Sequence, residues 1–112
     1  MNVRLESIQK DPETVRGFVR GIIAALRLTH DHHDEAVAIA QKEFPTMAPE
    51  DLKATLERCF ADEMWSQDGM ISRQAWDTAQ KVVRSADILK ADVAYDDIID
   101  MQFVKATLAS GK

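Results

Sequence analysis

The chain has 112 residues, which is enough for one hydrophobic core and therefore for a single domain. Hydrophobic residues make up 46% and charged residues 29%, a composition that excludes an intrinsically disordered chain. The net charge is -5, and no cluster of Lys and Arg is available to follow a phosphate backbone, so we expect no nucleic-acid partner.

Apolar residues recur every three or four positions along most of the sequence, and this period predicts an all-α fold. We expect about five helices in a compact bundle that forms one domain over residues 1–112. The first helix is expected to begin at Asp11, an N-cap residue followed by Pro12, and to end near Thr29. Its predicted apolar stripe consists of Val15, Phe18, Val19, Ile22, Ile23 and Leu26.

Gly17 and Gly21 lie beside this stripe, four residues apart. A glycine inside a helix costs about 1 kcal/mol relative to alanine, so a pair of them needs a reason. We interpret the pair as a place where another helix approaches closely, from this chain or from another.

Four more helical segments follow. The second is expected from about Asp34 to Phe44, and the third begins at Pro49 and ends near Asp62. Asp68-Gly69 then predicts a turn before Ser72, the N-cap of a helix that extends to about Ala86. The core positions expected in this fourth helix are Ala75, Trp76, Ala79, Val82, Val83 and Ala86. The last helical segment covers about 95–108, with a break expected near Asp100.

The cluster His-Asp-His-His-Asp at residues 30–34 is the strongest candidate for metal binding, because two imidazoles and a carboxylate are ligands that zinc or nickel accepts. On one continuous helix, His30, His33 and Asp34 would share a face. The cluster falls at the junction of two expected helices, however, and lacks the His-Glu-x-x-His pattern of a hydrolytic zinc site. We therefore expect a solvated interhelix turn and assign no metal ligand.

Trp65 and Trp76 could stack a ligand, and Asp68 could accept a hydrogen bond from it. A tryptophan among alanines and valines at helical spacing more often belongs to a core. We therefore interpret the two tryptophans as anchors that hold a helix hairpin together around the Asp68-Gly69 turn. The same segment lacks the alternating ligands of a calcium loop.

No residue carries a catalytic signature. Ser66, Ser72 and Ser110 have no Gly-x-Ser-x-Gly context, Cys59 lies in a helix without a recognisable base, and no glycine-rich phosphate loop occurs. The sequence predicts no enzyme, no catalytic residue and no cofactor. Cys59, the only cysteine, is expected to act as a small buried hydrophobe.

No apolar run reaches the roughly 20 residues of a membrane span, so we expect no membrane insertion. The first residues lack the basic and apolar regions of a secretory signal, which predicts a cytoplasmic location.

Four segments in this order resemble the C-terminal portion of substrate-binding proteins of ABC transporters. They are SIQKDPETVRGFVRGIIAAL, DEAVAIAQKEFPTMAPEDLKATLE, SQDGMISRQAWDTAQKVV and DDIIDMQFV, and the resemblance covers about residues 6–104. The branch is the one for nitrate, sulfonates, taurine and thiamine-pyrimidine precursors, and it includes the thiamine-pyrimidine synthases. The resemblance implies the C-terminal part of a type II periplasmic-binding-protein-like fold, in which the hairpin packs on two α/β lobes.

The family's two lobes, its secretion signal and most of its ligand contacts have no counterpart in these 112 residues. The resemblance therefore transfers no ligand-binding residue, and it places the chain in the periplasm only as part of a secreted protein. The histidines at 30–33 also depart from the family, whose members tend to have an Asn-Pro-Asp-Glu-like turn there.

Helices shaped to cover a sheet leave apolar stripes exposed when the sheet is missing. Burying about 800 Å² of apolar surface would yield roughly 20 kcal/mol before the costs of association, so we expect a homo-oligomer, a two-fold dimer.

Three functions follow as hypotheses. The first is a stand-alone or truncated domain related to the ligand-binding component of a transporter, with a small-molecule ligand. The second is a helical homodimer that acts as an interaction module without a ligand. The third is a cytoplasmic metal-binding protein that uses His30, His32 or His33.

Overall fold

The chain is described by a computed structural model over residues 2–111, and its regular secondary structure is helical throughout that range. Seven α-helices occur within it: α1 (Leu5–Lys10), α2 (Pro12–Asp31), α3 (His33–Glu43), α4 (Pro49–Ala61), α5 (Arg73–Ser85), α6 (Tyr95–Ile98) and α7 (Gln102–Ala109). The all-α prediction is confirmed. Within residues 2–111, none of the helices has the length and apolar content needed to cross a membrane.

The predicted helix starts are confirmed where a cap or a proline signalled them. Ser72 accepts a hydrogen bond from the backbone N–H of Ala75 at 3.1 Å, and α4 begins at Pro49. The expected break near Asp100 is also present, since its side chain accepts a hydrogen bond from the N–H of Gln102 at 2.9 Å, where α7 begins. Helix α1 was not predicted, because its sequence contains only two large apolar residues and no capping side chain.

Asp11 separates α1 from α2 and caps the second helix. One carboxylate oxygen accepts from the N–H of Thr14 at 3.2 Å and the other from the Thr14 hydroxyl at 2.6 Å. The hydroxyl hydrogen bond, followed by the backbone one, holds the pKa of Asp11 below its ordinary value of 3.8.

We predict that Asp11→Ala lowers the melting temperature at pH 7 and that this deficit shrinks as the pH falls below about 3.8. The pKa is lower in the folded chain, so the ionised carboxylate stabilises α2 above the unfolded pKa, and this stabilisation is lost as the pH falls through the folded pKa. Asp11→Asn should keep the capping hydrogen bond to the N–H of Thr14, but its side chain does not titrate. Thermal melts of the three proteins between pH 2.5 and 7 test this, and an Asp11→Ala deficit that does not change with pH would contradict it.

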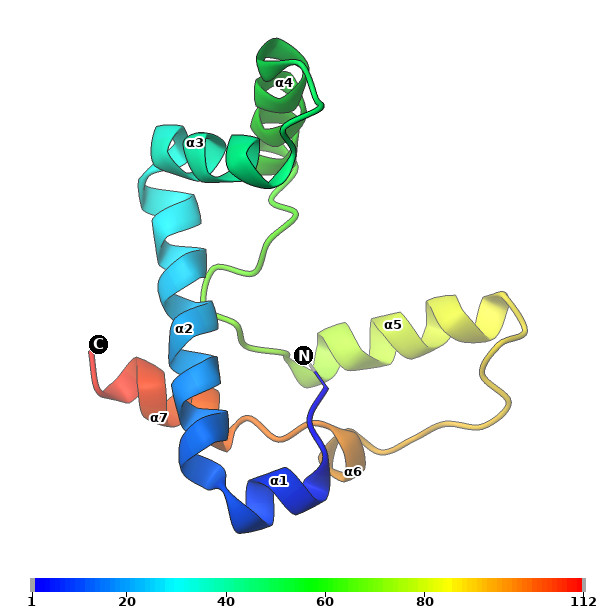
Figure 1. The fold of residues 1–112 in the computed structure, drawn as a ribbon. Helices are drawn as coiled ribbons and strands as arrows, with labels where there is room; N and C mark the ends of the chain where they lie inside the picture. The colour runs from blue at the N-terminus through cyan, green and yellow to red at the C-terminus, as the bar shows by residue number, and fades with distance from the viewer. Residues whose placement is uncertain (1, 112) are drawn as a thin grey trace.

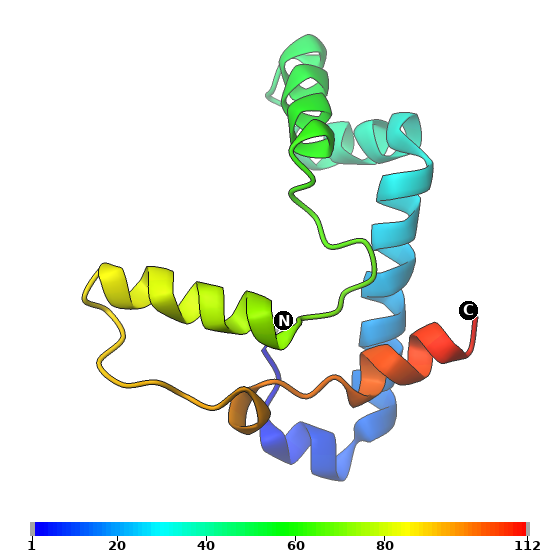
Figure 2. The same ribbon diagram turned by 180° about the vertical axis from the view of Figure 1, so that it is seen from behind.

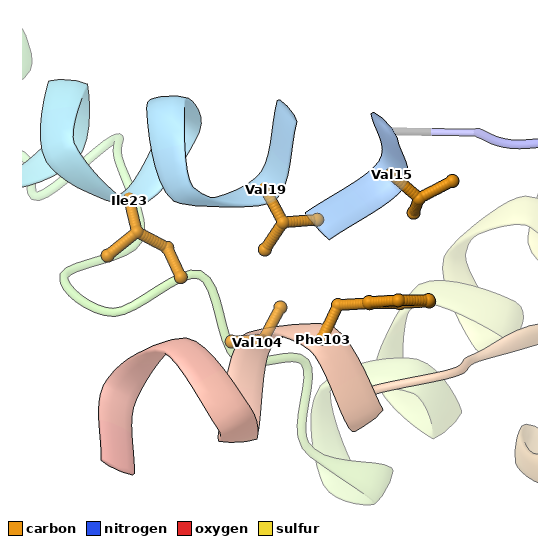
Figure 3. Packing of buried hydrophobic residues seen from close by; sticks show 5 residues of the cluster. All are labelled: Val15, Val19, Ile23, Phe103 and Val104. Carbon is orange, nitrogen blue, oxygen red and sulfur yellow. The ribbon is translucent and has the colours of Figure 1, made fainter. Parts of the chain in front are cut away.

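The core lies between α2 and α7. Figure 3 shows side chains of α2 pointing toward side chains of α7, and these buried residues are Val15, Val19, Ile23, Phe103 and Val104. The Asp68-Gly69 turn packs on the same core, since a Cβ added at Gly69 would lie 3.7 Å from Ile23. Gly69 has a φ of +77°, which favours glycine, and the predicted turn is confirmed.

Helices α3 and α4 form a hairpin at the C-terminal end of α2, whereas α7 crosses the N-terminal half of α2 and α1 turns away from its N-terminal end (Figures 1 and 2). Helix α5 projects away from α2 as a separate arm. The molecule is therefore somewhat extended: its radius of gyration is 16.9 Å, against about 13 Å for a compact domain of this length.

Two of the predicted apolar faces are exposed. On α2, Phe18 and Ile22 of the predicted stripe are 56% and 44% exposed. The core prediction for α5 was wrong: no residue within 73–85 is buried, although five positions of this helix, together with Ala86 directly after it, were assigned to the core. Around Gly17 and Gly21, a Cβ would meet no atom of residues 2–111 within 4 Å, so the close approach predicted there does not come from this part of the chain.

Candidate functional site

The histidine cluster occupies the junction of two helices, as predicted. Helix α2 ends at Asp31 and α3 begins at His33, with His32 between them. His30 Nε2 lies 3.2 Å from the carbonyl oxygen of Ser66, which ties the end of α2 to the loop that follows α4. A hollow of about 540 Å³ is lined by residues 30–35, which supply three imidazoles and three carboxylates.

His33 contacts an aromatic residue from another helix. Its ring stacks on Phe60 of α4, with the centroids 3.8 Å apart and the planes 3° from parallel. Trp65 lies on Phe60 in turn, at 5.3 Å and a tilt of 56°. The three rings join α3, α4 and the following loop.

The geometry does not gather these residues as metal ligands. Among residues 2–111, no group of three or more His, Cys, Asp or Glu side chains is placed to hold an ion. His30 instead contacts Ser66 and joins α2 to the loop after α4, whereas His33 contacts Phe60 and joins α3 to α4 within the hairpin.

Trp76 anchors a different part of the chain from Trp65. Its indole N–H donates to the carbonyl oxygen of Val93 at 3.0 Å, while the side-chain oxygen of Gln80 accepts from the N–H of Val93 at 2.8 Å. The segment after α5 therefore returns along one side of that helix. The prediction that Trp65 and Trp76 together hold one turn was wrong, because each contacts a segment on its own side of the Asp68-Gly69 turn.

A larger hollow, of about 740 Å³ and widely open to solvent, follows this side of α5. Arg73 donates to both carboxylate oxygens of Asp96, at 2.7 and 2.8 Å, and its guanidinium lies 4.7 Å from the centre of the Tyr95 ring. The hydrogen bonds with Asp96, followed by its negative charge, raise the pKa of Arg73. Arg84 pairs with Asp92 at the far end. These ion pairs fix α5 to the segment 92–96.

The nucleophilic side chains serve local contacts. Ser66 Oγ accepts from the N–H of Gly69 at 2.9 Å, Ser72 caps α5, and Ser110 donates to the carbonyl oxygen of Thr107 at 2.8 Å. Cys59 is half-buried on α4. The three serines therefore each form a hydrogen bond with a residue three positions away.

The structure thus brings His33, Phe60 and Trp65 together, a contact that the sequence pattern did not predict. Asp68 does not face a ligand site with Trp65, because its carboxylate accepts from the N–H of Met70 at 2.8 Å within the turn. The chain matches no protein-family model, no curated protein and no solved structure.

Proposed function

We propose that this chain is a non-catalytic helical domain related to the substrate-binding proteins of ABC transporters, in the branch for nitrate, sulfonates, taurine and thiamine-pyrimidine precursors. The observation that carries the proposal is the amount of apolar surface that the helices leave uncovered. Among the described residues, six hydrophobic side chains are buried, whereas thirteen large ones are exposed. Helices that lie against further protein, as the family's C-terminal helices lie against its lobes, have this character.

The total surface supports the same conclusion. The structure exposes 8501 Å², whereas a compact monomer of 12.6 kDa exposes about 6200 Å². The excess of about 2300 Å² is the surface that further protein would cover. Three of the four segments that resemble the family also fall on elements that carry this surface: the first on α1 and α2, the second on the α3–α4 hairpin and the third on α5. The fourth falls on α6 and the start of α7.

Ligand binding tests this function. A thermal-shift panel of taurine, an alkanesulfonate, nitrate and a thiamine-precursor pyrimidine should include one compound that raises the melting temperature. A ligand at 100 times its dissociation constant stabilises the fold by about 2.7 kcal/mol. Sodium chloride at matched ionic strength is the control for the anions, and an unchanged melting temperature with every compound at millimolar concentration would contradict this function.

A second function is a helical homodimer that serves as an interaction module without a ligand. The same excess surface of about 2300 Å² favours it, because each chain of a stable dimer buries about 800 Å² against its partner. As an interaction module the chain would work in the cytoplasm. Under the first function, as part of a secreted binding protein, it would work in the periplasm. A dimer that responds to no compound of the panel would favour the second function over the first.

A further inference from the structure

Helix α5 has one side that its own chain covers. Val93 exchanges hydrogen bonds with Gln80 and Trp76, and Asp92 pairs with Arg84 one turn later. These residues of α5 share one face because they are four residues apart. The returning segment therefore covers the polar side of the helix.

The apolar side of α5 is uncovered. Ala75, Ala79, Val82 and Ala86, which we call the α5 stripe, recur at spacings of three and four and lie about a third of a turn away from the covered side. All four are exposed, and Val82 is 63% exposed. A helix of 13 residues is marginal in water without packing, so this stripe needs a partner surface.

The rest of the same molecule is not free to supply that surface, because the base of α5 is fixed. Arg73 holds Asp96 through two hydrogen bonds, and the Tyr95 hydroxyl donates to the carbonyl oxygen of Ile71 at 2.5 Å. These contacts on either side of Ser72 set the direction in which α5 leaves the core, away from α2 (Figures 1 and 2).

A matching surface exists on α2. Gly17, Phe18, Gly21 and Ile22, which we call the α2 flank, lie beside the face that packs on α7. The two glycines leave open space where a Cβ would be, and the two large side chains next to them are half-exposed. Small residues on both helices permit an interaxial distance near the lower end of the usual 8–10 Å.

We propose that a second copy of this chain covers these surfaces, and that the α5 stripe of each copy packs on the α2 flank of the other about a two-fold axis. The two contacts are equivalent and close the assembly. The whole chain exposes about 2300 Å² more surface than a compact monomer of its mass, and burying the roughly 800 Å² per partner that a stable dimer needs would remove part of that excess. The inference rests on the second function proposed above and names the surface through which that dimer forms.

Ala79→Glu tests the α5 side. A carboxylate in the middle of the stripe would lie against apolar atoms of the partner, so the dissociation constant should rise at least 100-fold. Gln74→Glu adds the same residue and charge at an exposed position about a third of a turn away from the stripe, and it should leave dimerisation unchanged. Light scattering and sedimentation equilibrium over a dilution series measure both constants, and circular dichroism monitors the helix content.

Gly21→Gln tests the α2 side independently. Its side chain has open space in the single chain but blocks the close approach of a partner helix, whereas Arg20→Gln places the same residue at an exposed position about 100° around α2 from Gly21, away from Phe18 and Ile22. Gly21→Gln should therefore weaken the dimer at least tenfold and Arg20→Gln should not. A wild-type dimer that both Ala79→Glu and Gly21→Gln leave intact overturns this interface but preserves self-association, whereas a monomeric wild type overturns the second function as well.

Discussion

Replacing Ile23 with alanine is expected to lower the free energy of unfolding by about 2–5 kcal/mol. Ile23 is 2% exposed and is the most buried large side chain of the described chain. It packs in the same cluster as Val19 and Val104, and its Cγ1 lies 3.7 Å from the place where a Cβ on Gly69 would be. Truncation therefore opens a cavity where α2, α7 and the Asp68-Gly69 turn meet.

The core is too small to compensate, because it consists of five buried residues on two helices. Urea unfolding followed by circular dichroism measures the loss. Ile39→Ala is the matched control: it removes the same atoms from the middle of α3, where the side chain is 44% exposed, and should cost less than about 1 kcal/mol. Equal losses for the two variants would contradict the assignment of the core to the α2–α7 interface.

The sequence predicted most helix boundaries because the signals for them are local. Asp11 before Pro12, Pro49 after Ala48, and Ser72 three residues before Ala75 all act on backbone groups within one turn. Asp100 breaks the last helix for the same reason. Helix α1 lacks such a cap and was missed, although Ile8 within it packs against the core.

The covered faces were less predictable, because a periodic pattern shows that a helix has an apolar face but not what packs on it. Val15 and Phe18 belong to the same apolar pattern on α2, yet only Val15 contacts α7, and Phe18 is 56% exposed. The α5 stripe is a complete apolar pattern with no cover in residues 2–111. Such a pattern is equally compatible with a core and with an interface.

The candidate site was predictable in position but not in contacts. Helix signals placed His30 and His33 at an interhelix junction, which the structure confirms. The stacking of His33 on Phe60 depends on how α3 and α4 cross, and no local pattern determines that crossing.

Leu52→Ala is expected to open the α3–α4 hairpin while the α2–α7 core stays folded. Leu52 is 3% exposed and is the one buried residue of α4, so its truncation should lower the free energy of hairpin opening by about 2–5 kcal/mol. Packing between α3 and α4 is spatially separate from the core, and regions with separate packing can open independently.

The two tryptophans distinguish this local opening from global unfolding. In a Trp76→Phe background, the emission of Trp65 reports its contact with Phe60 at the end of α4, and Leu52→Ala should shift it toward the red in native buffer. In a Trp65→Phe background, the emission of Trp76 should stay unchanged, because its hydrogen bond to Val93 lies outside the hairpin. Lys53→Ala alters the neighbouring, exposed position and should leave both signals unchanged. If the emission of both tryptophans shifts in Leu52→Ala, the hairpin and the core unfold as one cooperative unit, although they pack separately.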